Sequence, residues 1–248
     1  MRIELTGCTS AGKSTLAGRI LRICRDQGID AWMGYDFVLR QVRLDWIKSR
    51  LFRGLLVNLI SLSVCLVTWR NYLAFYRFAI RIIAQLPSGV AWFEKLYIGR
   101  DVLKNIGIYE IIRRRASGRQ LVLLDEGTLH TAHYLFVHVS VEPDIQDLST
   151  FINLVPLPDV VVYITESESV LIERTLERVH KRIPDRSYAS TQRFIKRAVA
   201  IFDRLGQQSA LEGRWMVVDS QRSNIVGQDD PDIAALSVAL KIAMIHEE

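Results

Sequence analysis

Short apolar runs recur along the chain, and the segments between them have the spacing of helices. Several runs are continuously apolar rather than alternating, which is typical of strands buried on both faces of a parallel sheet. Strands that alternate with helices predict a doubly wound α/β domain. The five predicted strands are Arg2–Thr6, Ala31–Tyr35, Gln120–Leu124, Asp159–Thr165 and Arg214–Val218.

One long segment interrupts this alternation between the second and third predicted strands. Phe37–Arg119 has helical character throughout, so we predict a large helical insertion. The chain then divides into a core of residues 1–36 and 117–248 and an insertion of residues 37–116. Near the end, a polar loop at Gln221–Asp232 precedes an amphipathic helix at Ile233–Ile245.

Composition places the chain among folded globular proteins. It has 248 residues, 49% hydrophobic and 24% charged, which excludes a disordered chain, a collagen or a coiled-coil rod. The three cysteines, Cys8, Cys24 and Cys65, lack zinc-type spacing and indicate reduced thiols. Met1 and Arg2 lead directly into the first strand without an export signal, so we expect a cytoplasmic protein.

The charge distribution suggests an anionic partner. The net charge is +5, but residues 37–120 hold 15 Lys and Arg against 4 Asp and Glu, which leaves the remainder mildly acidic. A phosphorylated small molecule, a membrane surface and nucleic acid all satisfy this pattern. Nucleic acid is the least favoured, because the basic residues are interleaved with long apolar runs and no recognition motif is present.

The insertion contains an uncharged stretch, Gly54–Trp69. As a helix it would span about 24 Å, short of a hydrocarbon core of about 30 Å. A buried core helix is the favoured interpretation, and an interfacial membrane helix or a true span stay open. A peripheral contact with an anionic membrane through residues 37–81 is suggested by the basic residues just ahead of this stretch: Arg40, Arg43, Lys48, Arg50 and Arg53.

The strongest chemical signal is a phosphate-binding loop after the first strand. Residues 7–15 fit the pattern G-x-x-x-x-G-K-[ST], with an apolar strand before it and helical spacing after it. Its backbone N–H groups and the helix N-terminus would bind phosphate oxygens. Lys13 would reach the β- and γ-phosphates, and the Ser14 hydroxyl would ligate Mg²⁺. The predicted nucleotide-binding residues are Gly7, Cys8, Thr9, Ser10, Ala11, Gly12, Lys13, Ser14 and Thr15.

A second motif follows the third predicted strand, where two carboxylates end the apolar run. Asp125 would lie beside the phosphate loop at the carboxyl edge of the sheet and hold Mg²⁺ directly or through water. Glu126 would polarise an acceptor hydroxyl or a water, or hold a substrate. His130 and His133 follow at a helical spacing, and for them a core or capping role competes with catalysis.

Three arginines recur every fourth residue on a predicted helix at Glu173–Arg186: Arg174, Arg178 and Arg182. Like charges at this spacing repel unless an anion offsets them. One interpretation is a lid, with Arg174 on the nucleotide and the other two arginines stabilising the transferring phosphoryl group. A solvated helix face, supported by the Glu177 and Lys181 pair, stays open.

Together these features resemble the thymidylate kinase and deoxynucleoside kinase branch of the P-loop kinases. The resemblance covers Met1–Asp36, Arg119–Ser220 and the last helix. It implies a five-stranded parallel sheet, ATP as phosphoryl donor, a mobile lid near residues 174–186, and an adenine near residues 220–222. It also implies that Asp36, at the end of the second strand, contacts the acceptor, although a helix N-cap is an equal alternative.

Two features depart from that family. Thymidylate kinases usually have an arginine after the third-strand aspartate, whereas this chain has Glu126 and Gly127. The insertion is also larger and more apolar than a nucleotide acceptor requires. Candidate acceptor contacts within it, which could equally be solvated surface, are Arg100, Lys104, Arg113, Arg114 and Arg115.

Two functional hypotheses follow. The first is an ATP- and Mg²⁺-dependent kinase whose acceptor is a nucleoside, a nucleotide, or a sugar or lipid-linked intermediate. Catalysis would consist of positioning and charge neutralisation, with Asp36 or Glu126 orienting the acceptor. The second is a nucleotide-switched binding module, in which nucleotide occupancy moves the insertion against a protein or membrane partner.

Overall fold

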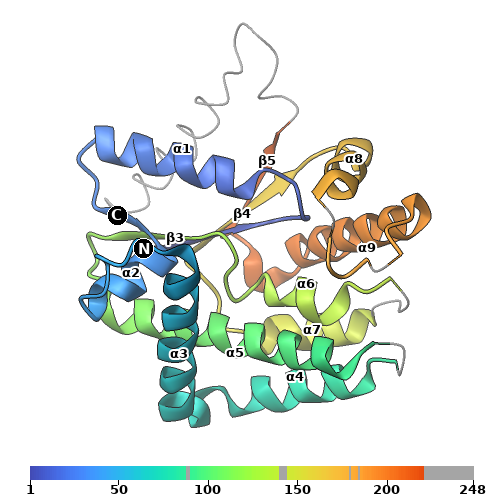
Figure 1. The fold of residues 1–248 in the computed structure, drawn as a ribbon, viewed down its shortest axis with the longest axis horizontal. Coiled ribbons are helices and arrows are strands. Elements are labelled where there is room, and N and C mark those ends of the chain that lie inside the picture. Colours follow the sequence, from blue (N-terminus) through green and yellow to red (C-terminus); the bar gives the residue numbers. More distant parts are fainter. Residues whose placement is uncertain (88–89, 140–143, 179, 184, 221–248) are drawn as a thin grey trace, which may run out of the picture.

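The computed structural model describes residues 1–87, 90–139, 144–178, 180–183 and 185–220. Five strands form one parallel sheet in the order β2-β3-β1-β4-β5, which confirms the predicted sheet (Figure 1). The strands are β1 (Arg2–Thr6), β2 (Ala31–Met33), β3 (Leu121–Leu124), β4 (Val160–Thr165) and β5 (Trp215–Asp219). The predicted polar loop after residue 220 and the predicted last helix lie outside the described residues.

The second strand is shorter than the sequence predicted. It ends at Met33, and α2 (Gly34–Gln41) begins at once, whereas we predicted a strand up to Tyr35. Gly34 lies so close to β3 that a Cβ there would be 2.6 Å from Leu124 Cδ2. The chain therefore turns into a helix directly over the neighbouring strand.

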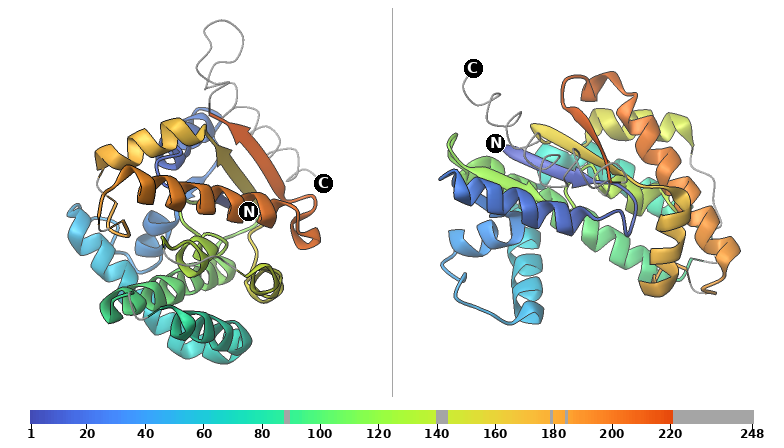
Figure 2. Two further views of the ribbon diagram at one scale, coloured as in Figure 1. Left: turned by 90° about the vertical axis from the view of Figure 1, so that its right-hand side faces the viewer. Right: turned by 90° about the horizontal axis from the view of Figure 1, so that it is seen from above.

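Helices cover both faces of the sheet. α1 (Lys13–Asp26) lies on one face, and α5 (Trp92–Arg115), α6 (Thr131–Phe136), α7 (Ile145–Leu154) and α9 (Tyr188–Gly206) lie on the other (Figures 1 and 2). α8 (Glu168–Arg178) packs against α9.

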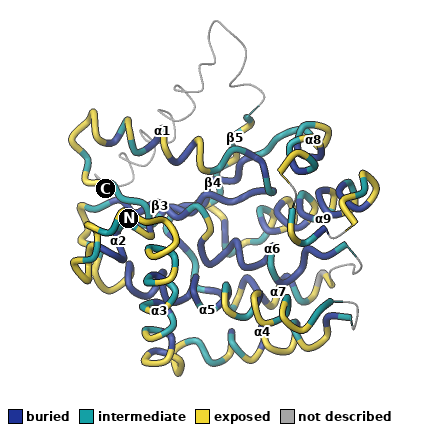
Figure 3. Tube along the Cα trace, in the orientation of Figure 1, coloured by how far each residue is buried: buried dark blue, intermediate teal, exposed yellow. Residues whose placement is uncertain are grey.

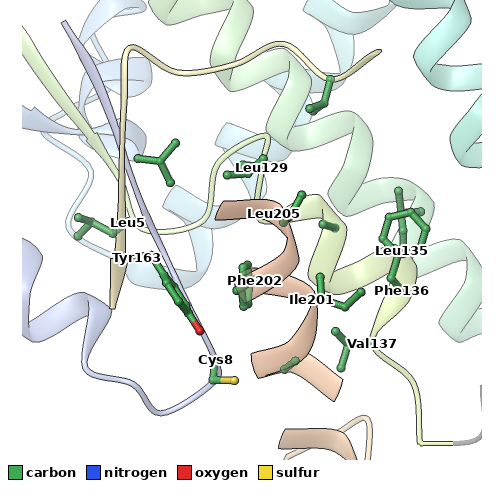
Figure 4. Packing of buried hydrophobic residues seen from close by; sticks show 14 of the residues in the cluster. Leu5, Cys8, Leu129, Leu135, Phe136, Val137, Tyr163, Ile201, Phe202 and Leu205 are labelled. Carbon is green, nitrogen blue, oxygen red and sulfur yellow. The ribbon is translucent and has the colours of Figure 1, made fainter. Parts of the chain in front are cut away.

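The main core lies between the sheet and the helices α6 and α9. Tyr163 of β4 packs against Phe202 of α9 with ring centroids 5.7 Å apart, whereas Leu5 of β1 lies on the opposite face of the sheet (Figure 4). Cys8 of the phosphate-loop segment joins this core, and its Sγ donates a weak hydrogen bond to the Ile195 carbonyl oxygen at 3.8 Å. The same packing that builds the core thus fixes the start of the loop.

The insertion consists of α2, α3 (Arg50–Thr68), a short 3-10 turn at Trp69–Tyr72, α4 (Leu73–Gln85) and α5. The second half of α5 is buried, and Ile108 and Ile112 pack with Val122 and Leu124 of β3. The inserted helices therefore share their core with the sheet.

α3 contacts α5 through one face and exposes the other, which is yellow and teal over much of its length in Figure 3. The expectation of a buried core helix is therefore correct for one face only. By length and composition alone, one stretch of the described chain, Arg50–Gln85, is apolar enough to cross a membrane, and 22% of its most apolar window is buried.

Candidate active site

The loop between β1 and α1 depends on three residues in left-handed conformations: Gly7 (φ 140°), Ser10 (φ 64°) and Gly12 (φ 94°). A Cβ at Gly7 would lie 2.6 Å from the Ile164 carbonyl oxygen of β4, so only glycine fits there. Gly12 is the N-cap of α1. This geometry turns backbone N–H groups toward one concavity at the positive end of a helix, which is a site for phosphate.

Lys13 begins α1, and its side chain folds back over the loop. Its Nζ donates hydrogen bonds to the carbonyl oxygens of Gly7 at 3.1 Å and Cys8 at 2.9 Å. Burial lowers the pKa of the ammonium group, and the carboxylates of Glu126 and Asp125 oppose that shift. The ammonium group thus lies within the loop where phosphates would bind.

The two predicted metal ligands are neighbours. The Ser14 hydroxyl donates a 2.7 Å hydrogen bond to Asp125 Oδ2. Asp125 Oδ1 is buried and accepts no hydrogen bond from the described residues. Hydroxyl and carboxylate oxygens are the ligands that Mg²⁺ prefers, and an unsatisfied buried carboxylate oxygen fits such an ion.

The described residues contain no group of three or more His, Cys, Asp or Glu side chains that could hold a metal ion alone. A divalent ion at Ser14 and Asp125 would therefore need further oxygens, which nucleotide phosphates provide in sites of this kind.

Glu126 lies beside Asp125 and is half exposed. It accepts a hydrogen bond from the Tyr134 hydroxyl, and its other carboxylate oxygen lies 3.9 Å from His130 Nε2. Burial, followed by the charge of Glu126, raises the pKa of Tyr134 well above its ordinary value. Tyr134 therefore stays protonated and holds the Glu126 carboxylate in place.

The loop after β3 rests on a buried carboxylate that the sequence analysis did not identify. Glu4 of β1 is fully buried and accepts hydrogen bonds from the backbone N–H groups of Leu129 at 3.1 Å and His130 at 2.6 Å. A Cβ at Gly127 would lie 2.3 Å from Glu4 Oε2. This contact explains why a glycine follows Glu126. The sequence signal for this buried carboxylate was the presence of the acidic Glu4 within a predicted apolar strand.

A cavity of about 670 Å³ adjoins the phosphate loop. The loop contributes Thr9 and Ser10, and the first half of α5 contributes an aromatic wall of Phe93 and Tyr97. The charged and polar lining residues are Glu94, Arg100, Asp101, Tyr134, Thr175, Arg178, His180, Lys181 and Arg182. Of these, only Arg100, Arg178 and Arg182 were predicted from the sequence as candidate site residues, and most of the others come from elements whose mutual placement the sequence does not show.

The three lid arginines do not share one helix face, which corrects the prediction of a helix over Glu173–Arg186. α8 ends at Arg178, so Arg182 lies in the segment that follows. The Pro184 ring disfavours helix at residue 183, and successive like charges repel. Arg174 contacts the Ser10 carbonyl oxygen and pairs with Glu166, each at 3.4 Å. Arg178 is exposed and lines the cavity.

Arg182 is largely buried, with its side chain 13% exposed, and binds the C-terminal end of α6. Its guanidinium donates to the carbonyl oxygens of His133 at 3.1 Å, Tyr134 at 3.2 Å and Val137. Its Nε lies 3.7 Å from Glu94 Oε1 of α5. Burial lowers the pKa of Arg182 to about 10, so it stays charged at neutral pH. Arg182 therefore anchors the segment after α8 to both α6 and α5.

Asp36 lies away from the cavity. It is in the first turn of α2, whose N-cap is Met33, so the alternative of a capping residue is wrong. Its carboxylate pairs with Arg53 of α3, and Asp36 is not among the residues that line the cavity. In this structure Asp36 joins α2 to α3, whereas Glu126 contacts a cavity residue through Tyr134.

The other candidate acceptor contacts separate in space. Arg100 lines the cavity, and Lys104 is buried beside it, 3.4 Å from Asp101. Arg113 and Arg114 instead pair with the buried Glu110 at the far end of α5.

His130 and His133 are buried and stacked with ring centroids 5.1 Å apart. Burial lowers both imidazole pKa values well below their ordinary value, so both rings are neutral core groups.

Comparison with known proteins bears on the fold. The chain is similar to thymidylate kinase from Ehrlichia chaffeensis, with a TM-score of 0.50, 13% identity and 98% of each chain covered. Deoxyadenosine kinase from M. mycoides matches with a TM-score of 0.49 and 14% identity, over 98% of this chain and 100% of that one. The likeness to thymidylate kinase shows that the chain has a P-loop kinase fold. No family model and no curated protein matches the chain.

Proposed function

We propose that this protein is a kinase that transfers the γ-phosphoryl group of ATP, with Mg²⁺, to a small acceptor. The observation that carries the proposal is the 2.7 Å contact of Ser14 with Asp125 at a phosphate loop whose residues Thr9 and Ser10 line a cavity of about 670 Å³. A phosphate loop and a second binding site next to it are what phosphoryl transfer requires.

The loop N–H groups and Lys13 would bind the β- and γ-phosphates of ATP. Ser14 and Asp125 would hold Mg²⁺, which neutralises charge on the phosphates when bound. Arg178 is exposed and lines the cavity, and it would be the arginine that contacts the transferring group. Arg182 supports the site indirectly, because its donors are engaged by the carbonyl oxygens of α6.

For the acceptor we propose a nucleoside or nucleotide. The ring wall of Phe93 and Tyr97 suits a planar base, and Arg100, Lys181 and Arg178 suit an anionic group. Glu126, held by Tyr134, would accept a proton from the attacking hydroxyl or orient it. The thymidylate kinase whose fold is similar to this chain is by its name a kinase of a nucleotide, which supports this class of acceptor.

The test is ADP formation by the purified protein with ATP, Mg²⁺ and a panel of nucleosides and nucleoside monophosphates. Lys13→Met should abolish acceptor-dependent turnover, because the phosphates lose their cation. Lys48→Met, which removes an exposed lysine before α3, is the matched control and should retain it. ADP formation that no acceptor stimulates, or that Lys13→Met leaves unchanged, would contradict the proposal.

A nucleotide-switched binding module is the second candidate function. It is favoured by the exposed apolar face of α3, which a soluble kinase does not need. ATP binding without any phosphorylated acceptor would support this candidate over the kinase.

A further inference from the structure

The helix α3 has its large apolar side chains on the outside. Its buried positions are occupied by small residues: Val57, Ser61, Cys65 and Thr68. Its leucines at 51, 55, 59 and 66 are 86%, 54%, 54% and 77% exposed. Surface helices of soluble proteins normally bury their apolar stripe and expose polar residues, so this pattern is reversed.

Packing against α5 fixes the reversed orientation. Gly107 of α5 approaches the α3 backbone so closely that a Cβ there would lie 2.2 Å from the Ser61 carbonyl oxygen. The Cys65 thiol also donates a 2.8 Å hydrogen bond to the Leu103 carbonyl oxygen of α5. A leucine cannot fit where the two backbones meet, so the leucines stay on the outer face.

An apolar groove of about 290 Å³ adjoins this outer face. α3 contributes Ile60, Val64 and Val67 to its lining, and α2 contributes Val42. Arg114 and Arg115 from the end of α5 also line the groove. Apolar walls together with guanidinium groups suit a ligand that has a hydrocarbon chain and a phosphate.

The positive charges near the outer face of α3 favour an anionic partner. Arg43, Lys48 and Arg50 lie exposed just before or at the start of α3, and Arg115 is exposed beside the groove. A second copy of the chain would bring the same positive charges against these, which repels. An anionic bilayer attracts them and also accepts the leucines.

We propose that the outer face of α3 binds the surface of an anionic phospholipid bilayer. The leucines insert among the acyl chains, the groove beside them takes one lipid chain, and the arginines contact lipid phosphates. This proposal does not depend on kinase activity, and the two can fail separately.

The test is flotation of the full-length protein with vesicles of mixed phosphatidylglycerol and phosphatidylcholine, and with vesicles of phosphatidylcholine alone. We expect binding to the anionic vesicles only, weakened by high salt. The double variant Leu59→Gln/Leu66→Gln should lower the partition coefficient at least about tenfold, because two apolar side chains no longer enter the bilayer. Both positions are exposed, so the substitutions spare the fold.

Val217→Gln is the matched control, because Val217 is 60% exposed on β5, at the opposite edge of the sheet from β2. It should leave the partition coefficient unchanged. No binding to anionic vesicles, or binding that the double variant retains, would overturn the proposal. So would light scattering that shows a dimer which the double variant converts to monomer, since a second copy would then occupy the face.

Discussion

The substitution Gly107→Ala tests the packing of the insertion. In an isolated helix, alanine is favoured over glycine by about 1 kcal/mol. At Gly107, however, the added Cβ would lie 2.2, 2.7 and 2.8 Å from the O, C and Cα atoms of Ser61. All three are backbone atoms, so no rotamer change can relieve the contact and α3 must move away from α5.

Overpacking of this kind costs up to about 3 kcal/mol, which leaves a net loss of stability of about 2 kcal/mol after the gain in helix propensity. For a chain of this size that corresponds to a fall in melting temperature of roughly 4–8 °C. Urea denaturation followed by circular dichroism measures the free energy of unfolding, and the midpoint should fall with an unchanged slope.

Gly99→Ala is the matched control within the same helix. A Cβ at Gly99 meets only Ile83 Cδ1 at 3.9 Å, so the gain in helix propensity should prevail and stabilise the protein by roughly 0.5–1 kcal/mol. The two substitutions are thus predicted to have opposite signs. A Gly107→Ala variant as stable as wild type would refute the close backbone contact between α3 and α5.

Three further predictions concern the site. Burial raises the pKa of Glu4 to about 7, so its contribution to stability is fully present below about pH 4.5 and lost as the pH rises through about 7. The buried histidines change the stability of wild type and Glu4→Gln alike, so urea denaturation should show that the stability of wild type relative to Glu4→Gln falls by about 3 kcal/mol across this range. A difference between the two proteins that does not change with pH would contradict this prediction. Arg182→Ala should lower the free energy of unfolding by about 3 kcal/mol, because it removes hydrogen-bond donors to α6. Arg178→Ala should change the free energy of unfolding by less than about 0.5 kcal/mol but lower kcat at least about tenfold. Denaturation and steady-state kinetics measure the two effects, and equal losses of stability in both variants would be evidence against these roles. All three cysteines are buried, and burial raises the pKa of Cys8 to about 12. Titration with a thiol reagent should therefore detect no reactive cysteine in the native protein and three in denaturant. Rapid labelling of the native protein would contradict the packing of Cys8.

Much of the core architecture could be predicted from local patterns. Continuous apolar runs marked the strands because both faces of the sheet are covered, and the spacing of Gly7, Gly12 and Lys13 marked the phosphate loop. The end of the second strand was missed because it depends on Gly34 approaching Leu124, a contact between segments far apart in the sequence. The orientation of α3 was missed for the same reason, since Gly107 decides which face is buried.

The candidate site was likewise predictable from the sequence only in part. Ser14 and Asp125 could be paired in advance, because both follow strands of a parallel sheet and the carboxyl ends of such strands meet at one edge. Arg182 was assigned to a helix on spacing alone, whereas its contacts with α6 draw it into the segment after α8. Tyr134 and Glu94 carry no motif, and only the fold brings them to the cavity.

The most direct test of the proposed function follows the label from γ-labelled ATP in single-turnover reactions with nucleoside and nucleotide acceptors. Wild-type protein should transfer the label to an acceptor, and Asp125→Asn should lose transfer while keeping the folded circular dichroism spectrum. Label that appears only as free phosphate, or transfer that persists without the Asp125 carboxylate, would contradict a kinase built on Lys13, Ser14 and Asp125.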